Sequence, residues 1–128
     1  MKTVILDTNF LLIPWQFKVD IFEEMKRVCP FQIKPKVVEG TLRELDQLTK
    51  SGKPKDRKAA QFALKLIKHY HVGCIPSPKE IHVDDEILSL PQEGLVVGTL
   101  DQALKQRLLA KGASVLVLRQ KNHLELLA

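Results

Sequence analysis

The first twelve residues, Met1-Lys-Thr-Val-Ile-Leu-Asp-Thr-Asn-Phe-Leu-Leu12, give the strongest indication of the fold. Thr3 to Leu6 is β-branched and aliphatic, a composition typical of a short strand that is buried on both faces. Asp7, Thr8 and Asn9 follow directly. We therefore expect their side chains at the carboxyl end of this strand, the edge at which open α/β sheets bind ligands. The alternative is that Asp7 or Asn9 only caps the next helix.

The rest of the chain alternates between predicted helices and predicted strands. Such alternation requires a parallel sheet that is covered by helices on both faces. The sequence therefore predicts an α/β fold with three α/β/α layers around a parallel sheet of about five strands, as one domain over residues 1–128. After the opening strand we expect further strands over 31–37, 72–75, 94–99 and 115–118, and helices over 20–29, 38–49, 59–70, 102–111 and 122–127, with one more beginning at Asp84 or Asp85.

Composition and charge narrow the class of protein. Apolar residues make up 45% of the chain and charged residues 27%, which indicates a globular protein and excludes a disordered one. The apolar runs are too short to span a bilayer and the N-terminus lacks the plan of a signal peptide, so we expect a cytoplasmic protein with no membrane partner. Cys29 and Cys74 are expected as buried thiols. The net charge of +5 suits a polyanionic partner.

Four acidic residues fall where they could meet. Asp7 and Asp101 end the first and fourth of these buried strands, and Glu44 and Asp84 lie near the starts of two helices. If the two strands are neighbours, the four carboxylates converge at one sheet edge, and their repulsion requires a divalent cation. Ligation by oxygen alone favours Mg²⁺ or Mn²⁺ over zinc. With no phosphate-binding glycine loop or nucleophile elbow in the chain, the pattern indicates phosphodiester hydrolysis.

Two of these assignments have alternatives. Glu44 could be an ordinary solvated helix residue. Asp84 lies three and four residues before Ile87 and Leu88 and so shares their helix face, whereas Asp85 is rotated by about 100°. We expect Asp84 in the site, with Asp85 as its substitute.

A basic stretch follows the helix predicted over 38–49. Residues 50–58 read Lys-Ser-Gly-Lys-Pro-Lys-Asp-Arg-Lys and predict a loop broken by glycine and proline. Its cations are candidates for contacts with a phosphate backbone, although a loop that only aids solubility is the alternative. The candidate residues for this contact are Lys53, Lys55, Arg57 and Lys58.

In the order and spacing of its motifs the chain resembles PIN-domain ribonucleases over essentially its whole length. The resemblance implies an RNA endonuclease that depends on Mg²⁺ or Mn²⁺, with acidic positions at Asp7, Glu44, Asp84 and Asp101 and supporting polar residues at Asn9 and Thr99. The matching segments are Val4-Ile-Leu-Asp-Thr-Asn9, Leu42-Arg-Glu-Leu45, Lys53-Pro-Lys-Asp-Arg-Lys58, Val83-Asp-Asp-Glu-Ile-Leu88 and Val96-Val-Gly-Thr-Leu-Asp101.

Within that family, the basic stretch and the Asp84-Asp85 pair look more similar to ribosomal-RNA-processing members than to toxins. They imply a role in ribosomal RNA processing or RNA turnover, while Leu100 replaces a polar residue of many relatives. The resemblance leaves open a homodimer and a protein partner besides RNA. The alternatives are an inactive scaffold that binds RNA or ribosomes, a toxin of a toxin–antitoxin pair, and, more distantly, a receiver-like or phosphatase-like protein that accepts phosphate on an aspartate.

Overall fold

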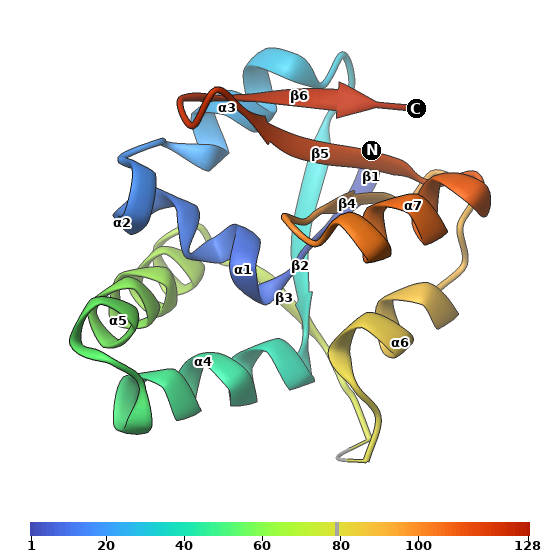
Figure 1. Cartoon of the computed structure of the whole chain (residues 1–128). Helices are drawn as coiled ribbons and strands as arrows, with labels where there is room; N and C mark the ends of the chain where they lie inside the picture. Colours follow the sequence, from blue (N-terminus) through green and yellow to red (C-terminus); the bar gives the residue numbers. More distant parts are fainter. Residues whose placement is uncertain (79) are drawn as a thin grey trace.

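The centre of the molecule is a six-stranded sheet in the order β3-β2-β1-β4-β5-β6 (Figure 1). The structure is a computed structural model that describes every residue of the chain except residue 79. The first five strands are parallel, as predicted, and β6 is antiparallel to β5. The strands are β1 (Lys2–Leu6), β2 (Ile33–Val38), β3 (Gly73–Ile75), β4 (Val96–Gly98), β5 (Ser114–Arg119) and β6 (His123–Leu127).

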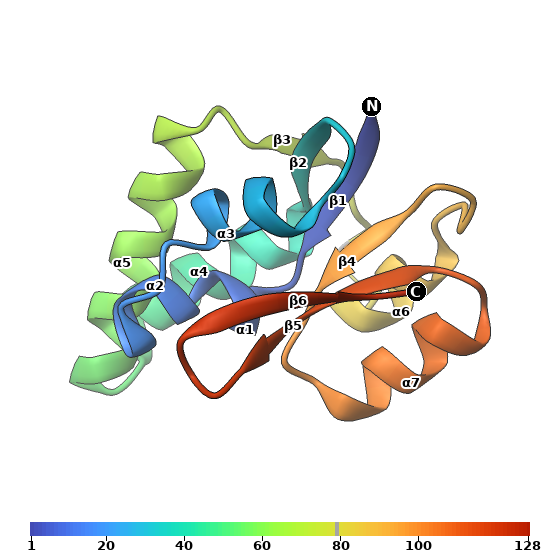
Figure 2. The same cartoon turned by 90° about the horizontal axis from the view of Figure 1, so that it is seen from above.

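Helices cover both faces of the sheet, which confirms the three-layer α/β/α fold. Seen from above, α6 and α7 lie on one side and α2, α3 and α5 on the other (Figure 2). Side chains alternate along a strand, so Val4 and Leu6 pack into one core while Ile5 packs into the other. The helices are α1 (Thr8–Leu11), α2 (Ile13–Phe17), α3 (Ile21–Val28), α4 (Glu39–Ser51), α5 (Pro54–His69), α6 (Val83–Ser89) and α7 (Gln102–Ala110).

The first and fourth strands are neighbours, which is the condition that the predicted acidic site requires. Leu6 pairs with Gly98, and the Asp7 amide donates to the Gly98 carbonyl over 2.9 Å. A Cβ at residue 98 would lie 2.7 Å from Cε2 of Phe10, closer than carbon atoms approach. Glycine therefore lets the buried Phe10 ring, and with it α1, pack against the end of β4.

The C-terminal segment is where the prediction was wrong. Residues 122–127 form β6 and not a helix. Gln120 and Lys121 both have positive φ, and the Asn122 amide donates to the Arg119 carbonyl over 3.1 Å, as in a type I′ turn. This turn folds the chain back, and Leu124 becomes fully buried in the core.

The basic stretch is also not the loop that was predicted. Lys50 belongs to α4, and only Gly52 and Lys53 separate α4 from α5. Pro54 occupies the first turn of α5, a position that proline tolerates because its missing N–H is not needed there. Lys55, Arg57 and Lys58 therefore lie in the first turns of a helix.

The two cysteines were both expected to be buried. Cys29 is buried as predicted, but Cys74 is exposed, because β3 is an edge strand. Within the described part of the chain, no helix is long and apolar enough to cross a membrane.

Candidate active site

A cavity of about 550 Å³ opens where β1 and β4 end, and four carboxylates line it. Asp7 follows β1, Glu44 lies on α4, Asp84 lies on the first turn of α6, and Asp101 precedes α7. Asn9 also lines the cavity. The fold thus brings together four carboxylates that are up to 94 residues apart in sequence, between Asp7 and Asp101.

The two aspartates of the Asp84-Asp85 pair differ in their relation to the cavity. Asp84 and its neighbour Val83 line it and Asp85 does not, although both aspartate side chains are exposed. The helix begins at Val83, slightly earlier than the sequence suggested.

Thr99 joins two of the aspartates from beneath the cavity. Its buried hydroxyl donates to Oδ2 of Asp7 over 2.8 Å and accepts the Asp101 amide N–H over 3.1 Å. Oδ1 of Asp7 accepts the Thr8 amide over 2.9 Å, and Oδ1 of Asp101 accepts the Leu104 amide over 3.0 Å. Both aspartates therefore cap a helix, which the alternative interpretation held for Asp7, and both also line the cavity.

Two threonines that the sequence analysis did not select hold Glu44. The Thr8 hydroxyl donates to Oε1 of Glu44 and lies 3.4 Å from the hydroxyl oxygen of the fully buried Thr41. These contacts fasten α1 to α4 at the cavity wall. Thr8 stands between Asp7 and Asn9 in the polar turn after β1, which was the available signal, and nothing in the sequence marks Thr41.

Asp7 is the cavity carboxylate whose pKa the surrounding structure clearly shifts. The pKa of Asp7 is raised above its ordinary value, chiefly by burial and further by the charges of Glu44 and Asp101, while the hydrogen bonds from Thr99 and Thr8 oppose the shift. A bound cation would relieve this repulsion.

The donor atoms around the cavity are carboxylate, hydroxyl and amide oxygens, the chemistry that Mg²⁺ and Mn²⁺ prefer. The described His, Cys, Asp and Glu side chains contain no group of three that is already arranged to hold a metal ion. The cavity therefore fits such an ion in its chemistry, and its carboxylates would have to turn inward to ligate one.

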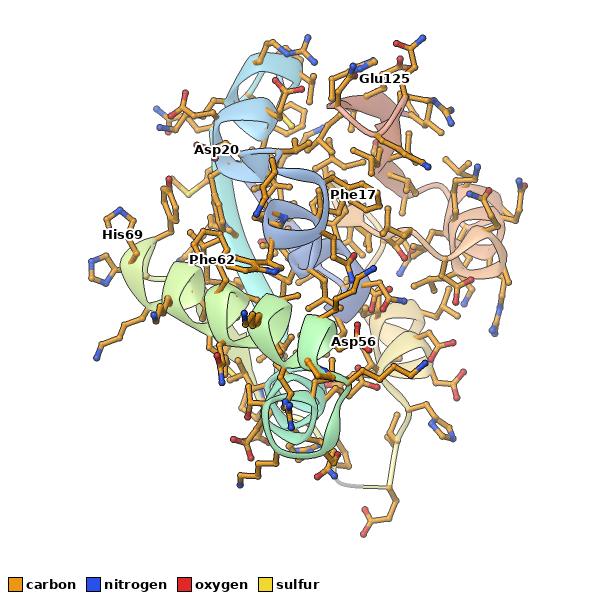
Figure 3. The ribbon with its side chains drawn as sticks, turned by 60° about the vertical axis from the view of Figure 1, so that its left-hand side comes forward. Phe17, Asp20, Asp56, Phe62, His69 and Glu125 are labelled. Atoms are coloured by element: carbon orange, nitrogen blue, oxygen red, sulfur yellow. The ribbon has the colours of Figure 1, made fainter. Side chains whose placement is uncertain are left out.

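The predicted RNA-binding cations lie outside the cavity, at the start of α5. Lys53, Lys55, Arg57 and Lys58 are exposed, and we call these four residues the basic segment. Residues 53–69 contain six Lys or Arg and one Asp, a net charge of +5 that equals the formal net charge of the whole chain. Asp56, Phe62 and His69 mark the course of this helix in Figure 3. The excess positive charge of the protein is thus concentrated along α5.

The acidic cavity lies at the carboxyl edge of a largely parallel sheet, where open α/β folds bind ligands. Residues 4–121 match the family model described as "PIN like domain". The chain belongs to this family, as its motifs indicated.

Two archaeal ribonucleases are similar to nearly all of the chain. It is 29% identical to ribonuclease VapC4 of Methanocaldococcus jannaschii over 98% of this chain and 97% of that protein. It is 28% identical to ribonuclease VapC9 of Archaeoglobus fulgidus over 94% of this chain and 85% of that protein.

Solved structures show the same fold. The structure of the PIN domain endonuclease Utp24 is similar, with a TM-score of 0.78 and 26% sequence identity over 97% of this chain and 90% of that one. A domain of a Methanocaldococcus jannaschii protein of unknown function has a TM-score of 0.58 at 16% identity, over 93% and 92% of the two chains, and supports the fold alone.

Proposed function

We propose that this protein is a divalent-metal-dependent endoribonuclease that hydrolyses RNA phosphodiester bonds in the acidic cavity. The observation that carries the proposal is the convergence of Asp7, Glu44, Asp84 and Asp101 from four separate places in the chain onto one cavity. The full-length similarity to proteins named as ribonucleases supports RNA as the substrate.

Each carboxylate of the cavity is assigned a role in binding the metal or in orienting the attacking water. Asp7, Asp84 and Asp101 would hold Mg²⁺ or Mn²⁺, and Glu44 would hold a second ion or orient the attacking water. When bound, the metal lowers the pKa of water and neutralises charge on the phosphate. Thr99 keeps Asp7 and Asp101 in register through its two hydrogen bonds, and Thr8 fixes the rotamer of Glu44.

Asn9 is exposed at the cavity and can hydrogen-bond the incoming RNA or an ordered water. Attack of water in line with the leaving 3′ oxygen would leave 5′-phosphate and 3′-hydroxyl ends.

The basic segment is proposed to hold the RNA backbone outside the cavity. Exposed cations at the start of α5 attract phosphates without reading the base sequence. Because α5 follows α4 after a two-residue connection, the basic segment and Glu44 belong to one helical hairpin. An RNA strand bound along α5 is thereby placed on the same side of the sheet as the wall of the cavity that α4 forms.

The test is a cleavage assay on end-labelled single-stranded RNA with Mg²⁺, Mn²⁺ or EDTA. We expect metal-dependent cleavage that Asp7→Asn reduces by about a hundredfold or more, the scale seen when one catalytic electrostatic group is lost. Asp20→Asn is the matched control, because Asp20 caps α3 through the Phe22 and Glu23 amides, both 3.1 Å away, and does not line the cavity. RNA binding without cleavage in either metal would instead support an inactive RNA- or ribosome-binding scaffold.

The natural target can be sought with the same variant. Sequencing of RNA crosslinked to Asp7→Asn in its native cells should recover ribosomal RNA precursors if the likeness to the ribosomal-RNA-processing members holds. Recovery of other RNA classes alone would contradict that role and leave the endonuclease proposal intact.

A further inference from the structure

One cation, Arg43, is found among the described residues that line the acidic cavity. It precedes Glu44 on α4, and the sequence analysis did not select it. RNA carries a negative charge at every linkage, so four carboxylates oppose its entry into the cavity. A guanidinium in the cavity wall would repel a metal ion and attract a phosphate, so binding of a metal alone does not explain its position.

The guanidinium of Arg43 is held from two sides. Nη1 donates to Oε1 of Glu39 over 3.3 Å, and Nη2 donates to the carbonyl of Pro78 over 3.2 Å. The same Glu39 oxygen accepts the Ser77 amide over 3.2 Å, and the Ser77 hydroxyl accepts the Gly40 amide over 3.2 Å. Both anchors of Arg43 therefore belong to one network, which ties the start of α4 to the segment before α6.

This arrangement leaves part of the guanidinium free for a ligand. Arginine has five N–H donors in a planar fork, and the two bonds above are its hydrogen bonds to the described residues. The side chain is 36% exposed, so a solute in the cavity can reach it. A charged, pre-positioned fork with spare donors is the group that matches a phosphate best.

We infer that Arg43 binds a backbone phosphate of the RNA beside the scissile linkage, an inference that rests on the proposed function. Glu39 and the Pro78 carbonyl hold the guanidinium at the cavity wall, and its free N–H groups take the phosphate oxygens. Positive charge at this point steers the RNA so that the next linkage enters among the carboxylates.

The competing explanation is structural. Arg43 could serve only to fasten the Ser77–Pro78 segment, and so to place α6 and Asp84. A structural role would lower cleavage of every RNA by the same factor. A phosphate contact would couple Arg43 to one linkage of the RNA and to no other.

The experiment compares wild type and Arg43→Gln in the cleavage of short single-stranded RNAs that have a defined cleavage site. Each RNA carries one methylphosphonate linkage, which removes one backbone charge. We expect one linkage next to the cleaved one at which methylphosphonate lowers kcat/KM of the wild type about tenfold or more, the scale of a charge-assisted hydrogen bond. In Arg43→Gln the same replacement should have little effect. Arg43→Lys, which keeps the charge and loses the fork, should recover part of the coupling.

Arg27→Gln is the matched control. Arg27 is also anchored by a glutamate on its own helix, Glu24 at 2.9 Å, and by a distant carbonyl, that of Leu124 at 3.0 Å, but it is not a cavity residue. It should keep the wild-type profile across all linkages. Parallel profiles for Arg43→Gln and wild type would overturn the inference, whatever the loss of overall rate.

Failure of the proposed function would be recognised separately. If the wild type binds RNA and does not cut it, the same series is measured as Kd by fluorescence anisotropy in Mg²⁺. Coupling at a single linkage would then still establish the phosphate contact, and its absence would refute it. A wild type that binds no RNA would reject both proposals together.

Discussion

Neutralising Asp7 should remove activity without weakening the metal-free fold. In Asp7→Asn the side chain keeps its shape, so Oδ1 can still accept the Thr8 amide and the new amide group can donate to the Thr99 hydroxyl. What the variant loses is the buried negative charge that Glu44 and Asp101 oppose. In EDTA we therefore expect the variant to unfold at the same temperature as the wild type or at a higher one.

Two opposing contributions decide the effect of Asp7→Asn on the free energy of unfolding. Two hydrogen bonds change from charge-assisted to neutral, which costs about 1 kcal/mol each. Against this, the raised pKa of Asp7 means that the ionised form destabilises the native state. A carboxyl with a raised pKa stabilises the fold fully only below its ordinary value of 3.8 and loses that stabilisation as the pH rises. The advantage of the variant should therefore be largest near neutral pH and shrink as the solution is acidified.

Magnesium should reverse the order of stability. At 10 mM metal and a Kd of about 1 mM, binding to the native state alone adds roughly 1.4 kcal/mol. For a chain of this length that is a rise in Tm of about 5 °C. Asp7→Asn lacks a ligand and should show a much smaller rise.

Calorimetric or fluorescence melting in EDTA and in Mg²⁺ measures all of these quantities, with Asp20→Asn as the control that should respond to magnesium like the wild type. Equal magnesium shifts in wild type and Asp7→Asn would refute the metal site. A loss of about 2 kcal/mol in EDTA, with no magnesium shift in either protein, would show that Asp7 is only a helix cap.

Three further outcomes are expected from other parts of the molecule. Asp84→Asn should reduce cleavage at least about tenfold more than Asp85→Asn, because only Asp84 lines the cavity; the reverse order in the cleavage assay would place Asp85 in the site. Replacing the basic segment by alanine should lower the slope of log K against log salt for RNA binding by up to about 0.7 per residue, with little change in Tm. An unchanged slope would show that these cations are only solvated and do not contact RNA. Glu24→Gln should cost about 1 kcal/mol at neutral pH, allowing for solvent screening, because Glu24 binds Arg27 and accepts the Leu124 amide of β6. Arg27 lowers the pKa of Glu24 to about 2, so this stabilisation is present above the ordinary pKa of 4.5 and is lost as the pH falls through about 2, where the Tm values of variant and wild type should meet.

The sequence predicted those parts of the fold that are determined by the pattern of neighbouring residues. A buried parallel strand is a run of aliphatic residues, and the run Val4 to Leu6 needs no distant partner to be recognised. The same holds for Val96 and Val97 before Asp101. Since the carboxyl ends of parallel strands share an edge, the placement of both aspartates followed as soon as β1 and β4 proved to be neighbours.

The two errors in the predicted secondary structure have physical reasons that the sequence does not display. Proline was taken as a helix breaker, yet Pro54 begins α5, because the first turn of a helix does not need its N–H. The β5–β6 turn lacks the Asn-Gly or Gly-Gly pair that usually marks such a hairpin, and it places Gln120 and Lys121 at positive φ instead. Leu124 and Leu127 have the i, i+3 spacing of a helix face, and Leu124 and Leu126 have the i, i+2 spacing of a strand face. Only pairing with β5 decides between the two.

The sequence analysis selected the four carboxylates that line the cavity, Glu44 included, but not the cation beside them. Arg43 and Glu44 are consecutive on α4 and carry opposite charges, and adjacent helix residues point about 100° apart. Both line the cavity because α4 crosses its edge, a position set by the contacts of Thr8 with Glu44 and of Glu39 with Ser77. With a carboxylate and a guanidinium side by side on one helix, the cavity has one flank suited to a cation and another suited to a phosphate. Hydrolysis of RNA in this cavity would need both groups. A bound metal alone, without a group that binds the RNA backbone, would not position the scissile linkage among the carboxylates.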